Sequence, residues 1–377
     1  MAAHNPAVAI QTHFADLEDP RIERTRRHDL MDILVIALCA VICGAEGWVD
    51  IAKYGVAKYD WLKTFLRLPE GIPSHDTFRR VFCLLDPAAF QACFQRWIDA
   101  LSECLGLKRI AIDGKVLRRS FDRASGRAAL HLVSAWATEQ HLVLGQVAVD
   151  AKSNEITAIP KLLELLDVSG AIVTIDAMGC QKEIAAAIRE GGGDYVLSVK
   201  DNQPHLLEDI RLCFEQGLDS GFAGLAHSYH EEVIRGHGRV EAHYVYTILH
   251  PQGIRDLSLW RDLKAITMIC SERREAGKDA TVEFRYYIGS KAAKASAYAG
   301  YVRGHWGIEN GLHWVLDVSF DEDQSRLRTD HSPENMALLR RLALSLLKQN
   351  DRKGSVRGKR LQSGWDDQFL TEVLSPK

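Results

Sequence analysis

Apolar residues over the first hundred positions recur at helical spacing, and the pattern predicts a series of helices. Residues 33–45 carry no charged side chain, and Asp29 before them and Gly44 near their end are typical helix boundaries. This uncharged run is shorter than the roughly 20 residues that cross a bilayer, so it predicts a buried helix. Three further helices are predicted, over about 48–66, from the N-cap Ser74 to 84, and over about 87–105.

Short helices joined by tight turns are typical of a helix-turn-helix-like DNA-binding unit. They are equally typical of a small helical bundle that makes no contact with DNA, and the pattern leaves both interpretations open. We therefore predict that residues 1–105 form an N-terminal helical domain, with DNA binding as its candidate function.

The pattern changes after Leu107, where short apolar runs of β type replace the helical spacing. Strands are predicted over 109–114, 131–138, 142–149, 171–176 and 194–199, with helices over about 155–166 and 181–191. Three strands of hairpin type followed by alternating helix and strand predict a mixed sheet covered by helices. This order matches an α/β fold of the ribonuclease-H-like kind.

The remaining residues extend and interrupt this predicted core. One helix and then β-rich segments, such as 239–249, 263–271 and 282–289, are predicted within 205–290. Helices over about 291–314 and 333–350 follow, with an acidic segment between them. The resulting domains are an N-terminal helical domain (1–105), a ribonuclease-H-like catalytic core (106–204 and 291–350), a β-rich insertion (205–290) and a basic C-terminal tail (351–377).

Composition restricts the function classes without naming one. The 377 residues have a formal net charge of −3, which argues against a polycationic protein that coats DNA. Local basic surface can still bind phosphates while acidic residues elsewhere cancel the total. The eight cysteines form no Cys-x2-Cys pair, which disfavours a zinc finger. With no signal peptide or membrane span in the pattern, we expect a cytoplasmic protein.

Two aspartates end predicted strands and share a context. Asp113 and Asp176 each follow a β-type apolar run, and each precedes a small residue, Gly114 or Ala177. A carboxylate at a strand end projects from a rigid edge and can bind a metal ion there. Either residue alone is as readily a loop or helix cap. Two carboxylates on neighbouring strands repel each other, and this repulsion favours a bound cation.

Glu309 is the candidate for a third carboxylate. His305, Glu309 and His313 recur every four residues, which places them roughly on one stripe of a predicted helix. A stripe of His and Glu is ordinarily just solvated. Trp306 and Leu312 can pack behind this one, however, and burying Glu309 without a cation or a hydrogen-bonding partner would be costly.

Three carboxylates at a rigid cleft suit Mg²⁺ or Mn²⁺, which prefer oxygen ligands, and two such ions support attack on a phosphodiester. His305 and His313 offer nitrogen ligands and therefore raise a zinc alternative. The spacing is not His-Glu-x-x-His, and no third histidine or cysteine stands near in the sequence. We therefore predict a site for magnesium or manganese at Asp113, Asp176 and Glu309.

With these residues in view, the sequence resembles insertion-sequence DDE transposases of the ISAs type, the branch that includes the H-repeat-associated proteins. The resemblance covers nearly the whole chain, and its motifs occur in fixed order. They are residues 14–21, 28–30, 111–115, 174–181, 195–203, 237–241 and 303–317.

The resemblance implies a ribonuclease-H-like core, a DDE triad at Asp113, Asp176 and Glu309, and a divalent metal, Mg²⁺ or Mn²⁺. It further implies double-stranded DNA as partner, both as terminal inverted repeats and as target DNA. Cutting at paired ends implies a homodimer on DNA. The signature Tyr-x2-Arg-x3-Glu-x6-Lys of related transposases is altered here, with Val302, His305 and Leu316 at its Tyr, Arg and Lys positions.

Polar residues after a predicted core strand are candidates for DNA contact. Lys200 can bind a phosphate, and Asn202 and Gln203 can reach base edges or sugars. The alternative interpretation is a polar loop that closes a strand.

A second group of candidates is basic. Arg235, His237 and Arg239 alternate with glycine in a turn that can approach a DNA backbone, although a solvated hairpin has the same pattern. Further candidate DNA contacts surround the predicted catalytic glutamate: Arg303, His305 and His313.

The leading functional prediction is a transposase that cleaves DNA at element ends and joins them to a target. One alternative is a ribonuclease-H-like nuclease or resolvase without strand transfer. Another is a domesticated DNA-binding protein that has lost catalysis. The large insertion and the N-terminal domain favour the transposase, because recognising and pairing DNA ends requires surfaces beyond a nuclease core.

Overall fold

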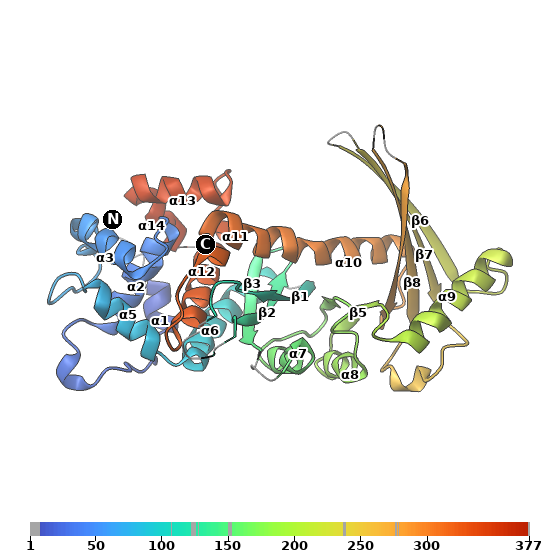
Figure 1. Ribbon diagram of the computed structural model, residues 1–377, viewed down its shortest axis with the longest axis horizontal. Helices are drawn as coiled ribbons and strands as arrows, with labels where there is room; N and C mark the ends of the chain where they lie inside the picture. Colours follow the sequence, from blue (N-terminus) through green and yellow to red (C-terminus); the bar gives the residue numbers. More distant parts are fainter. Residues whose placement is uncertain are drawn as a thin grey trace. The chain divides into compact units, whose positions relative to one another are not determined.

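The chain forms two compact units in the computed structural model (Figure 1), which describes residues 8–106, 108–121, 126, 128–149, 153–236, 239–275, 277 and 279–375. Unit 1 comprises the described parts of 1–107, 114–152 and 309–377. Unit 2 comprises 108–113 and the described parts of 153–308. Each unit combines segments that are far apart in the sequence.

Unit 1 is mainly helical. Its helices are α1 (Val8–His13), α2 (Leu30–Ile42), α3 (Trp48–Ala57), α4 (Tyr59–Leu62), α5 (His75–Leu84), α6 (Pro87–Leu105), α11 (Trp314–Phe320), α12 (Ser332–Gln349), α13 (Val356–Trp365) and α14 (Asp367–Leu374). Short turns of 3-10 helix lie at Glu23–Thr25 and Glu322–Gln324, and Glu309–His313 is a π-helical turn. The predicted N-terminal helices are confirmed.

The core of unit 1 is built around two helices that are buried on nearly all sides. Asp29 caps α2 by accepting a hydrogen bond from the backbone N–H of Met31 at 2.9 Å, and every residue from 32 to 42 is buried. Helix α12 is buried over most of its length and contacts α2, α5 and α6. A helix that is apolar all round is stable only inside a core, and the predicted buried helix at 33–45 is therefore confirmed.

Helix α12 also satisfies the end of α5. The side-chain amide of Asn335, which is fully buried, donates to the carbonyl oxygens of Phe82 and Leu85 at 2.9 Å each. The last carbonyls of a helix have no partner within the helix, so a side chain from another element replaces the missing donors. This contact joins two helices that are about 250 residues apart in the sequence.

The segment predicted only as a basic tail, 351–377, folds into α13 and α14. Two of its basic residues are buried: Lys359 donates to the carbonyl of Leu347 at 3.0 Å, and Arg360 donates to that of Val41 at 2.8 Å. Basic side chains near a helix end can satisfy its free carbonyls. Part of the positive charge of this segment therefore serves the packing of unit 1.

Strands β2 (His131–Ala137) and β3 (Leu142–Ala148) form an antiparallel hairpin in unit 1, as predicted. Unit 2 contains α7 (Glu155–Glu164), β4 (Ile172–Ile175), α8 (Lys182–Glu190), β5 (Asp194–Val199), α9 (Pro204–Asp219), β6 (His227–Gly236), β7 (Arg239–Leu249), a 3-10 turn (Leu257–Leu259), β8 (Ala265–Glu275), β9 (Thr281–Gly289) and α10 (Ala295–Ile308). Strand β1 (Arg109–Val116) begins in unit 2 and ends in unit 1.

The strands of unit 2 form a mixed sheet in the order β1-β4-β5-β9-β8-β7-β6. Strands β1, β4 and β5 are parallel to one another. The pairs β5–β9, β9–β8, β8–β7 and β7–β6 are antiparallel. Figure 1 shows the long strands β6, β7 and β8 side by side, with α9 next to them. The predicted α/β class, a mixed sheet with helices and a β-rich insertion, is confirmed.

One strand of the insertion was not predicted. Strand β6 is largely exposed and lies at the edge of the sheet, so its sequence lacks the buried apolar residues that β7 and β8 contain. The compact units also group segments differently from the predicted domains, since the start of the predicted core and the insertion share unit 2. The functional domain boundaries stay a prediction.

Helix α10 packs on the sheet of unit 2 through Tyr298, whose side chain is fully buried. A Cβ at Gly289 would lie 2.1 Å from the Tyr298 hydroxyl, so only glycine fits at this end of β9. The same hydroxyl donates to the carbonyl of Lys291 at 2.8 Å. The position of α10 on the sheet is thereby fixed near its start.

Across the described residues, no helix combines the length and the apolar composition needed to cross a membrane.

We predict that Asn335→Ala lowers the free energy of unfolding by about 1–3 kcal/mol, because two buried carbonyls lose their donor. Urea unfolding followed by circular dichroism measures this change. Asn350→Ala is the control, since the Asn350 side chain accepts one hydrogen bond at an exposed site, from Arg352 at 3.1 Å. Equal losses in the two variants would contradict the assigned role of Asn335.

Candidate active site

The parallel pairing of β1 and β4 brings two of the predicted catalytic residues together. Ile112 pairs with Ile175, so Asp113 and Asp176 come next at equivalent positions along the chain. Asp176 follows the last residue of β4, as predicted, whereas Asp113 lies within β1, which continues to Val116 instead of ending at the aspartate. Neighbouring strands lie about 4.8 Å apart, which places the two aspartates side by side where β4 ends. Both carboxylates are half-buried.

A tight turn after β4 fixes the carboxylate of Asp176. One of its oxygens accepts hydrogen bonds from the backbone N–H groups of Met178 at 3.1 Å and Gly179 at 3.4 Å. A Cβ at Gly179 would lie 2.3 Å from a methyl group of Ile175, so the turn can close against β4 only with glycine at this position. The sequence Asp-Ala-Met-Gly thus specifies a rigid position for the acid.

The loop after β5 holds this turn from the other side. The side-chain amide of Asn202 donates to the carbonyl of Ala177 at 2.7 Å, and that of Gln203 donates to the carbonyl of Cys180 at 2.9 Å. Both residues therefore position the turn that carries Asp176. Their predicted DNA contacts stay a prediction.

The surroundings of Asp176 make its carboxyl harder to ionise than an exposed aspartate. Burial raises the pKa of this carboxyl, and the negative charge of Asp113 raises it further. The two backbone N–H groups and His305 oppose these effects, but the pKa stays above its ordinary value. A divalent cation at this position would remove the repulsion between the two aspartates.

His305 reaches the same region from α10. Its Nδ1 lies 3.1 Å from the hydroxyl of Thr174 on β4, and that hydroxyl is 3.4 Å from the carbonyl oxygen of Ile110 on β1. The sequence marks Thr174 only as a hydroxyl within an otherwise apolar strand. It does not indicate that His305 is the partner of this hydroxyl. The contact fixes α10 over the two strands that carry the aspartates.

Glu309, the third predicted carboxylate, belongs to unit 1. It is exposed and begins the π-helical turn Glu309–His313, in which Leu312 is buried. A Cβ at Gly311 would lie 3.1 Å from the Trp136 ring, so this glycine lets the turn approach β2 closely. Single π-helical turns are rare and frequently occur at functional sites.

His305 lies in α10 of unit 2, whereas Glu309 and His313 lie in the π-helical turn of unit 1. The placement of the three side chains on one stripe stays a prediction. Within the described residues, no group of three or more His, Cys, Asp or Glu side chains is arranged to hold a metal ion. The oxygen ligands that suit Mg²⁺ are present as the Asp113–Asp176 pair in unit 2.

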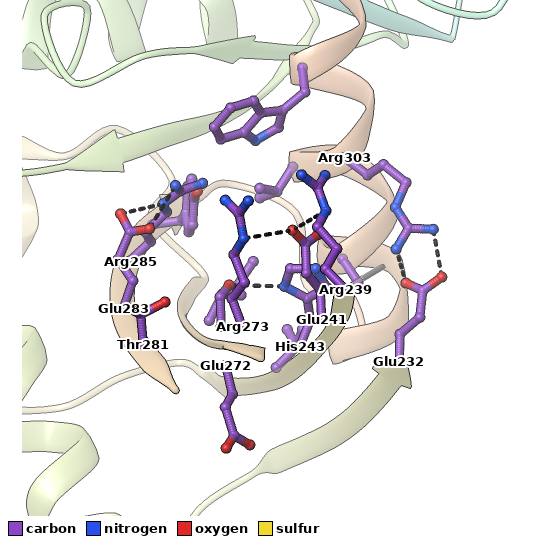
Figure 2. A pocket seen from close by; sticks show the side chains of 17 residues that line it. Glu232, Arg239, Glu241, His243, Glu272, Arg273, Thr281, Glu283, Arg285 and Arg303 are labelled. Atoms are coloured by element: carbon purple, nitrogen blue, oxygen red, sulfur yellow. Dashed lines mark hydrogen bonds and ion pairs between the residues drawn. The ribbon is translucent and has the colours of Figure 1, made fainter. Parts of the chain in front are cut away.

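A cavity of about 470 Å³ lies on the sheet of unit 2 beside α10. Figure 2 shows its charged residues in pairs: Arg303 with Glu232, Arg239 and Arg273 with Glu241, and Arg285 with Glu283. The guanidinium of Arg285 also lies 4.7 Å from the ring of Trp306. Every arginine at this cavity is therefore matched by a glutamate.

The remaining predicted DNA contacts are distributed over both units. Arg239 and Arg303 line the cavity, whereas Lys200 after β5 and Arg235 on β6 are exposed. In unit 1, the backbone carbonyl of His313 lies 3.5 Å from the ammonium of Lys115. His237 of the predicted basic turn lies outside the described residues.

Lys115 belongs to the motif 111–115 and has no role predicted from the sequence, yet its ion pairs lie inside unit 1. Its ammonium forms ion pairs with Asp317 and with Glu322, the latter at 3.2 Å. The sequence shows only that each of two motifs contains a charged residue. It does not indicate their ion pair, because about 200 residues separate the partners. The contact joins the end of β1 to α11 and to the turn after it.

We predict that Asp113→Asn lowers the pKa of Asp176, because it removes the negative neighbour while burial stays the same. The test is a ¹³C NMR titration of the Asp176 carboxyl in metal-free protein. In the wild type, Mg²⁺ should lower the same pKa. Asp167→Asn, which changes an exposed aspartate of unit 2, is the control and should leave the titration of Asp176 unchanged. An unaltered pKa in Asp113→Asn would refute the coupling of the pair.

Comparison with known proteins agrees with these features. The family described as "Transposase DDE domain" matches residues 105–346, and the family "DDE_Tnp_1-associated" matches residues 11–98. "Putative transposase YncI" of Escherichia coli O157:H7 is 39% identical over 95% of this chain and 92% of its own length. "H repeat-associated putative transposase YhhI" of Escherichia coli K12 is 38% identical over 97% of each chain.

The relatives also include a protein whose name describes lost activity. "Inactive transposase YbfQ" of Escherichia coli K12 is 52% identical over 14% of this chain and 64% of its own length. The matches to both families and to the long relatives cover most of the chain, including the strands that carry Asp113 and Asp176. The chain therefore belongs to the family of transposases with a DDE domain, as the resemblance of its motifs predicted.

Proposed function

We propose that this protein is an active DNA transposase that cleaves phosphodiester bonds at the ends of a mobile element and joins those ends to target DNA. The observation that carries the proposal is the Asp113–Asp176 pair, fixed at equivalent positions of two parallel strands. Membership of the transposase family supports it.

Asp113 and Asp176 would hold the divalent metal together with Glu309, which follows them in the order of the DDE triad. The two aspartates fit such a metal because carboxylate oxygens are ligands that Mg²⁺ and Mn²⁺ prefer. Burial raises the pKa of Asp176 and the repulsion between the carboxylates raises it further, and a cation would remove that repulsion. When bound, two such ions activate the attacking water or 3′-hydroxyl and stabilise the leaving oxygen.

The residues of the chain orient these groups. Backbone N–H groups of the turn after Asp176 keep its carboxylate in one orientation, and Asn202 and Gln203 keep the turn in place. His305, bonded to Thr174, fixes α10 on the same strands. A preorganised set of this kind limits the reorganisation that the reaction requires.

We infer that the partner is double-stranded DNA, both as terminal inverted repeats and as target. Lys200, Arg235, Arg239 and Arg303 are the proposed contacts to phosphates, which carry most of the affinity of such proteins. Cutting two ends together calls for two active sites, so we expect a homodimer on DNA, acting in the cytoplasm where bacterial DNA is found.

The first test of the proposal is DNA cleavage. Purified protein with element-end DNA and Mg²⁺ should produce strand breaks and joined products. Asp113→Ala, Asp176→Ala and Glu309→Ala should each reduce cleavage by at least about a hundredfold, because each removes a carboxylate that stabilises the metal-assisted transition state. Gel analysis of labelled ends measures both products.

Glu164→Ala and Asp167→Ala are the controls, because both residues are exposed acids of unit 2 away from the strand ends. They should cleave like the wild type. Cleavage that persists in the three triad variants would overturn the assignment of these residues. Cleavage without joined products would instead favour the nuclease or resolvase alternative.

A second prediction concerns the cavity in Figure 2, where Arg303 is paired with Glu232 through two contacts. Arg303 is 54% exposed, and an exposed ion pair contributes only about 0–1 kcal/mol. A DNA phosphate can therefore replace the glutamate. Arg303→Gln should weaken DNA binding severalfold, whereas Glu232→Gln should strengthen it, as measured by fluorescence anisotropy in metal-free buffer. Changes of the same sign in both variants would contradict a direct phosphate contact.

A further inference from the structure

A second cavity, of about 280 Å³, lies in unit 1 and is lined by Arg119, Phe121, Arg326 and Arg328. None of these described lining residues is acidic, although the cavity of unit 2 matches its arginines with glutamates. Guanidinium groups gathered without counter-charges repel one another, and a bound anion would relieve that repulsion.

The segment that provides Arg119 and Phe121 is a fixed turn at the end of β1. The hydroxyl of Ser120, which is buried, donates to the carbonyl of Leu117 and accepts from the backbone N–H of Leu130, at 2.7 Å each. The backbone N–H of Leu117 donates to the carbonyl of Leu130 at 2.8 Å. The residues on either side of Ser120 are therefore held in place.

Arg328 is fixed on this turn. Its Nε donates to the backbone carbonyl of Arg119 at 3.1 Å, and its guanidinium lies 4.9 Å from the ring centre of Phe121. This hydrogen bond uses one of the five guanidinium N–H donors, so the terminal nitrogens retain donors for a ligand. A solvated surface arginine would have neither contact to fix its orientation.

A buried charge network fixes the segment before Arg326. Glu322 is fully buried, and its two oxygens accept from Arg341 at 2.9 Å and from Lys115 at 3.2 Å. Burial alone would raise the pKa of Glu322, but Arg341 and Lys115 outweigh it and lower the pKa to about 2. Asp323, the next residue, pairs with Arg118 at 3.4 Å. Both segments that carry the arginines are thus tied to the end of β1.

We propose that this arginine cavity is a binding site for a backbone phosphate of DNA. Arginine binds phosphate through paired N–H donors, and the three arginines, with no acid among the described lining residues, offer several such donors. The site rests on the proposed function, since it would position DNA in the unit that contains Glu309. It carries no sequence information, because every phosphate presents the same oxygens.

The test measures DNA binding without metal, so that it does not depend on catalysis. Full-length protein is titrated onto a labelled duplex with an element end, in EDTA, at several salt concentrations. Arg326→Gln removes one exposed guanidinium and should reduce the slope of log K against log salt by about 1. Arg119→Gln combined with Arg326→Gln should weaken binding at least tenfold, equally for a duplex of unrelated sequence.

Arg352→Gln is the matched control in unit 1. Arg352 also lies against a phenylalanine ring, 5.2 Å from Phe369, but it pairs with Glu372 at 2.6 Å. Its loss should leave affinity and salt slope unchanged. Arg326→Lys should keep the slope, since the charge remains, with partial loss of affinity. Thermal unfolding of each variant verifies that the fold is intact.

The outcomes separate this site from the proposed function. A wild type that binds DNA, together with Arg119 and Arg326 variants that bind equally well with the same slope, would overturn the phosphate site alone. A wild type that binds no DNA would overturn the proposed function and this site with it. Loss of affinity confined to one DNA sequence would also overturn the site, because a phosphate contact weakens all sequences alike.

Discussion

The in-register parallel pairing of β1 with β4 is the constraint on which the candidate site depends. It places Asp113, within β1, beside Asp176, just after β4, where their negative charges repel each other. The rest of the surroundings holds this unfavourable arrangement in place. Gly179 lets the turn close, Asn202 and Gln203 fasten it, and so the fold maintains a repulsive pair that a cation can stabilise.

Charge is used in two different ways in the two units. At the cavity of unit 2, glutamates neutralise the arginines, so a DNA phosphate would have to compete with those ion pairs for the proposed contact at Arg303. In unit 1, the buried Glu322 forms ion pairs with Lys115 and Arg341. The nearby arginine cavity has no acidic residue among its described lining residues. Ion pairs within the protein therefore determine which basic residues can readily bind a phosphate. The net charge of the chain does not show which residues these are.

Much of the fold could be predicted because it follows from local patterns. The helix at 30–42 is apolar on every side, and the strand at 194–199 has a short β-type run with turn residues around it. Strand β6 escaped prediction because an exposed edge strand needs no apolar face. The helices after residue 355 were not predicted because Lys359 and Arg360 resemble surface charges in the sequence, although carbonyls at the ends of α12 and α2 bind them.

The sequence by itself determined the candidate chemistry: which acids are candidates, which motifs surround them and which family they resemble. Only the tertiary structure decided how those residues are held, because hydrogen bonds and ion pairs form between positions that are close in space and distant in the chain. The bond between His305 and Thr174 and the ion pair of Lys115 with Glu322 are such cases. No local pattern encodes them, since each depends on where another element packs.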